Sequence, residues 1–357
     1  MMRETQNVIG KFSRFTPGLK QGDDMKTIRW GIIGCGNVTE VKSGPGFQKA
    51  NNSQLIAVMR RNGALAKDYA ERHGVPKWYD DANALIADPG VDAVYIATPP
   101  ASHKEYTLVV ARAGKPVYVE KPMARSYPEC VEMIAACRSA GTPLFVAYYR
   151  RALPRFLKVK ELIESGLIGE PRLVTVALYQ KPAPEELDPN TLPWRVLPEI
   201  AGGGKFLDMA SHTLDFLDYV FGPIRLVKGL AANQAHLYPA EDIVSATFRF
   251  ESGVQGSGTW CFSSFHDEDT AEVVGSQGRI AFSSFGTDPV VLTTREGVAE
   301  FPIPNPPHIQ QPFIQRVVDE LNGVGTSPSA GVTGARTSWV MDEMLKEYRT
   351  GCKRHEA

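Results

Sequence analysis

The first half of the chain alternates short apolar runs with stretches whose apolar residues recur at helical spacing. Runs of this kind, separated by Gly, Pro, Asn and Asp, are typical of βαβ units around a parallel sheet. Six strands are predicted here: Ile28–Gly34, Leu55–Met59, Trp78–Tyr79, Ala93–Ala97, Val117–Glu120 and Pro143–Tyr148. Helices are predicted over residues 64–73 and 82–87, and after the Ser-x-x-Glu segments at Ser102 and Ser126, which have the pattern of a capping box. Strands and helices in this order predict a doubly wound, Rossmann-type sheet.

After Arg151 the pattern changes to strands that follow one another with few helices between them. Seven strands are predicted: Arg172–Leu178, Leu226–Ala232, Ile243–Glu251, Val254–Ser263, Ala271–Val274, Arg279–Phe282 and Val290–Thr293. Gly-containing turns between consecutive strands favour antiparallel pairing. Helices are predicted at four places: residues 157–165, 206–221, 312–322 and 335–349. The fold class is therefore predicted to be α/β, with an N-terminal Rossmann doubly wound parallel sheet (residues 25–150) and a C-terminal α+β domain with an open-faced, mostly antiparallel sheet (residues 151–350).

The two ends of the chain fall outside these predicted domains. Residues 1–24 contain scattered basic residues, Gly and Pro, but no apolar core of a secretion signal. Met25 stands directly before the first strand and is an alternative start; the segment could equally be an arm that packs on a partner subunit. Residues 351–357, which include Cys352 and His355, are expected to be a solvated tail rather than a metal site.

Composition agrees with two globular domains and narrows the partners. A chain of 357 residues is too long for one comfortable core. Its net charge of −1 gives no general attraction for nucleic acid or anionic membrane, and no apolar run approaches the roughly 20 residues that span a bilayer. The five cysteines are scattered and include no Cys-x-x-Cys pair, which predicts reduced thiols in the cytoplasm, no disulfide framework and no metal site.

A glycine turn follows the first predicted strand and precedes a helix. The turn consists of Gly34, Cys35, Gly36, Asn37 and Val38, and Thr39 stands where the dinucleotide-binding fingerprint usually has its third Gly. The first Gly permits a tight turn, and the second lets backbone N–H groups approach a pyrophosphate at the helix start. A lone Gly-x-Gly is weak evidence, but its place at the head of a six-strand series predicts a dinucleotide site.

The end of the second strand bears on which dinucleotide is bound. NAD-binding sites usually have an Asp or Glu here for the ribose 2′-hydroxyl. This chain has Arg60 and Arg61 instead, and guanidinium groups pair with phosphate. The alternative is that one or both arginines point into solvent. We expect NADP to be favoured, with NAD as the alternative cofactor.

Lys121 stands at the carboxyl end of a predicted core strand, between Glu120 and Pro122. Ligands of this fold lie beyond the carboxyl ends of the strands, which puts Lys121 at the cleft. Further on, Asp208 and His212 are four residues apart and project from one face of a helix that is otherwise strongly apolar. That polar stripe has the composition of a cleft lining; the alternative is the solvated side of an amphipathic helix.

Taken together, these motifs resemble the Gfo/Idh/MocA family of oxidoreductases, the family of glucose–fructose oxidoreductase and inositol dehydrogenase. The resemblance covers residues 25–350 and is carried by the following residues in order: the glycine turn, Ala97-Thr98-Pro99-Pro100 with His103, Glu120-Lys121-Pro122, Tyr148-Tyr149-Arg150-Arg151, Trp194-Arg195, and Gly202-Gly203-Gly204 with Asp208 and His212. One departure is Pro100, where relatives often have Asn, so a polar contact to the cofactor is in doubt.

The resemblance implies a role for each of these residues. His212 would be the general acid/base, Asp208 would orient it or bind substrate, and Lys121 would contact the substrate hydroxyl and the nicotinamide ribose. Residues implied to bind the cofactor, beyond the turn and the two arginines, are Thr98, Pro99, Pro100, His103, Glu120 and Lys121. Tyr149 and Arg195 are candidates to touch the substrate or the nicotinamide; Tyr149 could equally be core packing.

The expected activity is hydride transfer between nicotinamide and a carbinol or carbonyl carbon of a sugar, polyol or related small molecule. A histidine, with an ordinary pKa of about 6.5, can accept or donate the proton, and Lys121 would stabilise the alkoxide. The alternatives are an NAD-dependent glycosidase that oxidises a sugar transiently, a dinucleotide-binding regulator without turnover, and a reductase of a non-sugar carbonyl or diol. The resemblance also implies a homodimer or homotetramer formed through the open face of the second sheet.

Overall fold

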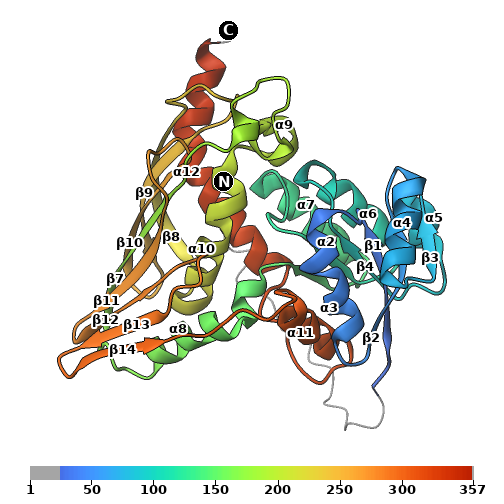
Figure 1. Cartoon of the computed structure of the whole chain (residues 1–357), viewed down its shortest axis with the longest axis horizontal. Helices are drawn as coiled ribbons and strands as arrows, with labels where there is room; N and C mark the ends of the chain where they lie inside the picture. The colour runs from blue at the N-terminus through green and yellow to red at the C-terminus, as the bar shows by residue number, and fades with distance from the viewer. Residues whose placement is uncertain (1–24, 356–357) are drawn as a thin grey trace.

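The computed structural model describes residues 25–355, with side chains through Gly351. The predicted extension over residues 1–24 and most of the predicted tail lie outside the described side chains. In Figure 1 the N-terminal part, in blue and cyan, lies beside a large sheet, and long helices stand between the two.

The N-terminal domain is built on a parallel sheet of six strands with the order β3-β2-β1-β4-β5-β6. The strands are β1 (Ile28–Ile33), β2 (Ser53–Met59), β3 (Lys77–Tyr79), β4 (Ala93–Ile96), β5 (Val117–Val119) and β6 (Leu144–Val146). Every residue of β4, β5 and β6 is buried, because helices cover both faces of the sheet. This confirms the predicted doubly wound, Rossmann-type sheet.

Helices connect these strands near the predicted positions. They are α2 (Asn37–Val41), α3 (Gly44–Lys49), α4 (Gly63–His73), α5 (Ala82–Ala87), η1 (Pro100–Ser102), α6 (His103–Arg112), α7 (Tyr127–Ser139) and η2 (Tyr149–Ala152). Helices begin after Ser102 and Ser126 as predicted, but the capping boxes themselves were a wrong prediction, since neither serine side chain caps its helix. Ser102 Oγ instead donates to Thr98 Oγ1 at 2.8 Å, so the preceding loop takes its hydrogen bond.

The C-terminal domain is built on a sheet of eight strands with the order β14-β13-β12-β11-β7-β10-β9-β8. The strands are β7 (Pro171–Tyr179), β8 (Ile224–Ala232), β9 (Ile243–Phe250), β10 (Gln255–Cys261), β11 (Glu268–Gly275), β12 (Gly278–Phe282), β13 (Val290–Thr294) and β14 (Gly297–Phe301). Only β7 and β10 pair in parallel, so the sheet is mostly antiparallel, as predicted. The sequence pattern missed β14, an edge strand whose residues are nearly all exposed.

Helices cover one face of this sheet. The helical segments of this domain are α8 (Pro154–Glu164), η3 (Pro184–Glu186), η4 (Trp194–Val196), α9 (Pro198–Ala201), α10 (Lys205–Phe221), α11 (Gln311–Leu321) and α12 (Gly331–His355). α8, α10 and α12 pack against the sheet, and Figure 1 shows them on a single side of it. The inner face is apolar, with Trp260 and Phe262 fully buried, whereas the other face carries no helix of the described chain.

The chain returns to the N-terminal domain at its end. α11 packs against α3, and its Phe313 stacks on Tyr118 of the parallel sheet with 5.7 Å between ring centroids. Ala330, just before α12, forms an isolated bridge with Phe145 of β6. The two sheets therefore share one continuous apolar core.

Candidate active site

The glycine turn lies directly after β1. Gly34 has φ +93°, a left-handed conformation that favours glycine, and a Cβ there would lie 2.8 Å from Thr98 Cγ2. Gly36 is extended (φ −139°, ψ −158°), and a Cβ on it would meet no atom nearer than 3.9 Å. Asn37 and Val38 begin α2, so their N–H groups have no acceptor within the helix. The backbone beside Gly36 is thus open to a close-approaching group.

Packing around the turn differs from the usual fingerprint. Thr39, in the place of the third Gly, is fully buried, and its Oγ1 donates to the Gly36 carbonyl at 2.8 Å. The Thr39 carbonyl accepts a hydrogen bond from the Tyr69 hydroxyl at 2.8 Å. A Cβ on Gly44, in α3, would overlap both that hydroxyl and that carbonyl oxygen. The close approach that the third Gly normally permits is therefore found at Gly44.

Arg60 reaches the turn from the neighbouring strand, since it follows β2. Cys35 is 1% exposed, and burial raises the pKa of its thiol to about 11, while the Arg60 guanidinium opposes that rise. Arg60 and Arg61 are both exposed. In the described part of the chain, no hydrogen bond or ion pair engages either guanidinium.

The segment after β4 lies next to the turn. Pro99 is extended, and Pro100 opens the short helix η1. His103 is fully buried, with Nε2 at 2.6 Å from the Thr98 carbonyl oxygen and Nδ1 at 3.1 Å from the Pro122 carbonyl oxygen. His103 therefore ties the loop after β4 to the loop after β5, and both its nitrogens are engaged by backbone.

Glu120 is the centre of a buried hydrogen-bond network. Its Oε1 accepts from the Tyr95 hydroxyl and from Gln310 Nε2, the latter at 2.6 Å, and its Oε2 accepts from the Lys121 backbone N–H at 3.1 Å. The Tyr118 hydroxyl donates to Gln310 Oε1 at 3.1 Å. Gln310 comes from the segment before α11, so the C-terminal domain helps to fix the position of Lys121. The sequence carried no signal for this network.

Lys121 and Asp208 form an ion pair between the loop after β5 and helix α10. Lys121 Nζ also donates to the Asp208 carbonyl at 3.1 Å, and Arg195 Nε donates to Asp208 Oδ2 at 3.1 Å. Burial on its own would raise the pKa of Asp208, but the two cations outweigh it and lower that pKa. Arg195 lies over the Trp194 ring, 4.5 Å from its centroid. The structure thus brings three predicted site residues into direct contact.

His212 lies one helical turn after Asp208 and is 3% exposed. Its Nδ1 is buried and has no hydrogen-bond partner among the described residues. Burial lowers the pKa of His212 well below 6.5, and the nearby cations, Arg150 and Lys121 foremost, lower it further. The imidazole is therefore neutral at neutral pH and can accept a proton.

Four side chains form a closed ring of contacts that includes His212, which we call the box: Tyr149, Arg150, His212 and Phe285. The His212 ring centroid is 5.2 Å from that of Tyr149 and 5.7 Å from that of Phe285. Arg150 Cζ is 5.4 Å from the Tyr149 centroid and 4.5 Å from the Phe285 centroid. Tyr149 is 6% exposed, so it belongs both to the core and to the surroundings of His212.

The loop that carries Phe285 is held in place by charged side chains that sequence reasoning missed. The Asp269 carboxylate accepts hydrogen bonds from three successive N–H groups, those of Ser284, Phe285 and Gly286, at 2.6 to 2.8 Å. Arg155 Nη2 donates to the Asp288 carbonyl at 2.6 Å and to Ser283 Oγ at 2.8 Å. No local pattern marks this loop, because its contacts come from residues far apart in the sequence.

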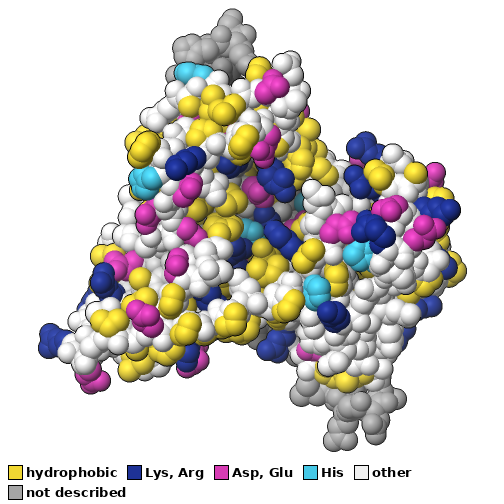
Figure 2. All heavy atoms as spheres, in the orientation of Figure 1, with side chains coloured by type: hydrophobic (Ala, Val, Ile, Leu, Met, Phe, Trp, Pro, Cys, Tyr) yellow, Lys and Arg dark blue, Asp and Glu magenta, His cyan; other side chains and the backbone are white. Residues whose placement is uncertain are grey.

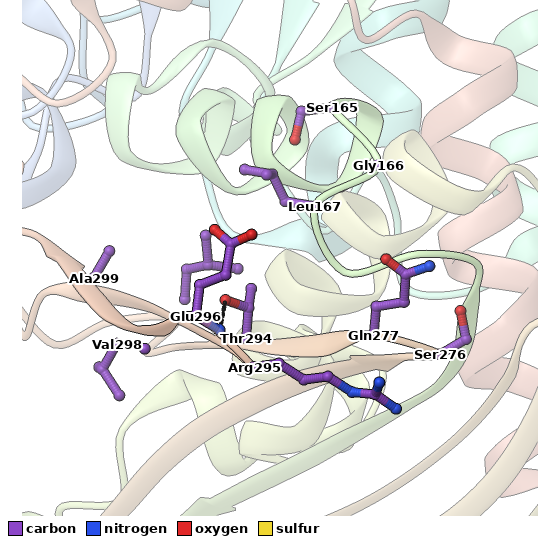
Figure 3. Close-up of a pocket in the computed structure, with 12 residues that line it drawn as sticks. Ser165, Gly166, Leu167, Ser276, Gln277, Thr294, Arg295, Glu296, Val298 and Ala299 are labelled. Carbon is purple, nitrogen blue, oxygen red and sulfur yellow. Dashed lines mark hydrogen bonds between the residues drawn. The ribbon is translucent and has the colours of Figure 1, made fainter.

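Other concave regions lie away from this site. A concavity of about 880 Å³ lies at the far end of the second sheet, between the residues that follow α8 (Ser165, Gly166 and Leu167) and the β13–β14 hairpin (Arg295, Glu296). Figure 3 shows the residues that line it. By contrast, Figure 2 shows cationic, acidic and histidine side chains gathered in the hollow between the two domains. Among the side chains described, those of residues 25–351, no cluster of His, Cys, Asp and Glu suits a metal ion, and no helix of the described chain has the length and apolarity to cross a membrane.

Comparison with known proteins identifies two family domains in the chain. Residues 28–148 match the model of an oxidoreductase family with an NAD-binding Rossmann fold, and residues 156–281 match the GFO/IDH/MocA C-terminal domain. Oxidoreductase P35 of Formosa agariphila is 39% identical over 88% of this chain and 97% of its own length. The trans-1,2-dihydrobenzene-1,2-diol dehydrogenase of Bos taurus is 30% identical over 85% of this chain and 86% of its own length.

A solved structure shares the whole architecture. The aldose-aldose oxidoreductase from Caulobacter crescentus superposes with a TM-score of 0.81 at 24% identity, covering 91% of this chain and 98% of that one. This likeness concerns the fold, whereas the two domain matches and the P35 relative concern the sequence. The chain belongs to the Gfo/Idh/MocA family of NAD(P)-binding oxidoreductases.

Proposed function

We propose that this oxidoreductase transfers a hydride between a nicotinamide cofactor and a CH–OH carbon of a sugar, polyol or related small molecule. The observation that carries the proposal is the contact of Lys121 with Asp208, one helical turn from a neutral His212 whose Nδ1 has no partner in the described chain. A buried unpaired nitrogen costs about 1–3 kcal/mol, which a hydroxyl of a bound ligand would offset.

The cofactor is proposed to lie along the carboxyl ends of β1, β2, β4 and β5. The pyrophosphate would approach the backbone at Gly36, where a Cβ finds open space. Arg60 is proposed to bind a 2′-phosphate. Its positive charge is near enough to the turn to oppose the rise that burial causes in the pKa of Cys35, and its guanidinium forms no hydrogen bond or ion pair with another described residue. We therefore favour NADP over NAD.

His103 and Glu120 are proposed to position the site rather than to bind the cofactor directly. Both nitrogens of His103 are engaged by backbone carbonyls, and both oxygens of Glu120 accept hydrogen bonds within the protein. His103 holds the loop that contains Thr98, and Glu120 holds the backbone of Lys121. Thr98, Pro99 and Pro100 keep the proposed place along the cofactor.

His212 is proposed to transfer the proton, and Lys121 is proposed to stabilise the developing negative charge. When bound, the nicotinamide supplies the hydride acceptor or donor. His212 takes the hydroxyl proton in oxidation and returns it in reduction, which its neutral state at neutral pH allows. The Lys121 ammonium stabilises the oxygen as negative charge develops on it. Asp208 keeps that ammonium in place, and Arg195, on the same carboxylate, is proposed to contact the substrate together with Tyr149.

The chain is also proposed to form a homodimer or homotetramer through the open face of the second sheet. Across the three strands β9, β10 and β7, two adjacent rows on that face carry small, uncharged side chains: Thr247, Ser257 and Thr175 in one, Ser245, Thr259 and Ala177 in the other. Leu230, beside the second row, is 73% exposed. A depression of about 480 Å³ is lined by part of both rows (Thr247, Ser257, Ser245 and Thr259) and by Leu230, Lys228 and Glu347. This stretch of small side chains, with Lys228 and Glu272 at the two ends of the first row, is the part of the face proposed to contact a second copy.

The test is a panel of polyols, aldoses and ketoses with NADP and NAD, run in both directions. Net reduction or oxidation of the cofactor by at least one substrate supports the proposal. Cofactor that stays bound without net turnover while a glycoside is cleaved would favour the glycosidase alternative. Tight binding of the cofactor with no turnover of any kind would favour a regulator.

A further inference from the structure

Arg150 is a buried cation without a carboxylate partner. Arg150 is 4% exposed. Its Nε and Nη2 both donate to the same acceptor, the Ser284 carbonyl, at 3.0 and 2.8 Å. Its Nη1 is buried with no hydrogen-bond partner among the residues that the structure describes. A buried charge of this kind is costly unless it is paired, so the protein alone leaves Arg150 incompletely satisfied.

The next residue shows how this segment satisfies an arginine when the role is structural. Arg151 is 2% exposed, and its Nε and Nη2 each donate to the Asp215 carboxylate at 2.7 Å. Its third nitrogen, Nη1, donates to the Pro328 carbonyl at 3.0 Å. Two adjacent arginines in η2 therefore differ in two respects: Arg151 has a carboxylate partner and every nitrogen engaged, and Arg150 has neither.

The unpaired nitrogen of Arg150 belongs to the box around His212. Tyr149 and Phe285 each contact both the Arg150 guanidinium and the His212 imidazole. His212 Nδ1 is the other buried polar atom of the box without a partner in the described chain. The charges of Asp269 and, more weakly, Asp208 also act on Arg150, although neither carboxylate forms an ion pair with it. Both unpartnered atoms thus belong to the proposed active site.

The carboxylates near the box are already engaged. Asp208 is shared between Lys121 and Arg195. Asp269 is capped by three backbone N–H groups, and Glu120 accepts from Tyr95, Gln310 and a backbone N–H. Two of the cations, Lys121 and Arg195, therefore share the Asp208 carboxylate, and Arg150 forms no ion pair with a carboxylate of the described residues.

We propose that Arg150 binds a carboxylate of the substrate, and that the preferred substrate is therefore an acidic sugar, a uronic or aldonic acid, rather than a neutral one. The inference rests on the proposed function, which places hydride transfer at Lys121 and His212. A carboxylate accepts the unused N–H groups of Arg150 and compensates its charge. The carboxylate only anchors the substrate and does not react; oxidation takes place at a carbinol carbon of the same molecule.

The test compares acidic and neutral members of matched pairs: D-glucuronate with D-glucose, and D-galacturonate with D-galactose. For the natural protein, we expect kcat/KM to be higher for the acid by roughly 10- to 100-fold, the worth of one charge-assisted hydrogen bond. Arg150→Met should bring the acid-to-neutral ratio close to one, and Arg150→Lys, which keeps the charge, should retain part of it. The ratio rather than the rate is read, because Arg150 also acts on His212.

Arg155→Met is the matched control, since Arg155 is buried and holds the same loop through Ser283 and Asp288. We expect it to keep the acid-to-neutral ratio. Equilibrium binding of D-glucuronate and D-glucose to the NADP-loaded protein supplies a readout that does not need turnover. Turnover of neutral sugars without preference for the acids overturns the inference and leaves the proposed function standing. Selective binding of the acid without hydride transfer supports the inference and overturns the proposed function. Equal binding of both sugars, or binding of neither, overturns the inference.

Discussion

Lys121 and Asp208 form an ion pair that joins the two domains, although 87 positions separate them in the chain. Lys121 belongs to the loop after β5, and Asp208 to the first turn of α10. The pair fixes the ammonium one helical turn from His212, in the position where the proposed reaction needs a positive charge.

Replacing Lys121 or His212 with Ala should lower kcat by on the order of 10²–10⁴-fold, because each variant loses charge stabilisation or proton transfer in the transition state. Cofactor affinity, measured by fluorescence titration, should change little. Lys104→Ala removes a surface lysine paired with Glu132 and serves as the control. Full turnover in His212→Ala would exclude that histidine as the acid/base.

Oxidation should persist at mildly acidic pH. Burial and neighbouring cations lower the pKa of His212 below 6.5, so the base form survives until the pH falls through that lowered value. A pH profile of kcat/KM should therefore show its acidic limb below 6.5. In Arg150→Met the limb should move to higher pH, because one of the cations that disfavour the imidazolium is gone. An acidic limb above 6.5 in the natural protein would contradict this account.

The same histidine should make the fold less stable in acid. The unfolded chain binds the proton with an ordinary pKa of about 6.5, and the folded protein binds it more weakly. Stability contributed by the neutral imidazole is therefore present above about pH 6.5 and is lost as the pH falls below it. Denaturant unfolding of His212→Gln should show a shallower loss over that range than the natural protein. The same pH dependence of the unfolding free energy in both proteins would mean that folding does not shift the pKa of His212.

Arg60→Ala should raise the Kd for NADP roughly 10- to 100-fold and leave the Kd for NAD nearly unchanged, since only NADP carries the 2′-phosphate. Lys67→Ala, on the adjacent helix α4 and paired with Glu71, is the control for a general loss of positive charge. Isothermal titration gives both constants. Tighter binding of NAD than of NADP by the natural protein would refute the arginine argument.

Replacement by Ala should have different effects at two glycines near the phosphate turn: it should lower cofactor affinity at one and the stability of the fold at the other. Gly36→Ala places a methyl group in open space, so the melting temperature should stay the same while cofactor affinity falls. Gly44→Ala forces a methyl group onto the Tyr69 hydroxyl and should cost about 1–3 kcal/mol of stability. Thermal melts with and without NADP separate the two effects. Undiminished cofactor affinity in Gly36→Ala would remove the proposed pyrophosphate position.

Much of this architecture was predictable because its signals are local. Strands buried on both faces, such as β4 and β5, read as short apolar runs, and Asp208 and His212 share a helix face through their spacing alone. β14 escaped prediction because an exposed edge strand needs no apolar alternation. The close packing expected at residue 39 is found at Gly44 instead. The sequence does not show this, because it depends on the approach of Tyr69 from α4.

The rest of the site depends on contacts between distant segments. Gln310 reaches Glu120 across 190 positions, and Asp269 holds Phe285 against His212 from a neighbouring strand. Arg150 belongs to the Tyr148-Tyr149-Arg150-Arg151 motif, yet nothing local distinguishes it from Arg151. Only the structure shows that one arginine is fully paired and the other is not.

The most direct test of the central claim is a deuterium-transfer measurement. A sugar or polyol that proves reactive is labelled with deuterium at its carbinol carbon, and the cofactor is analysed by mass spectrometry after one turnover, with natural protein and with His212→Ala. We predict that the natural protein yields reduced NADP carrying one deuterium and that the variant yields it on the order of 10²–10⁴-fold more slowly. Oxidised substrate without label in the cofactor, or label that returns to the product while a glycosidic bond is cleaved, would contradict a net hydride transfer.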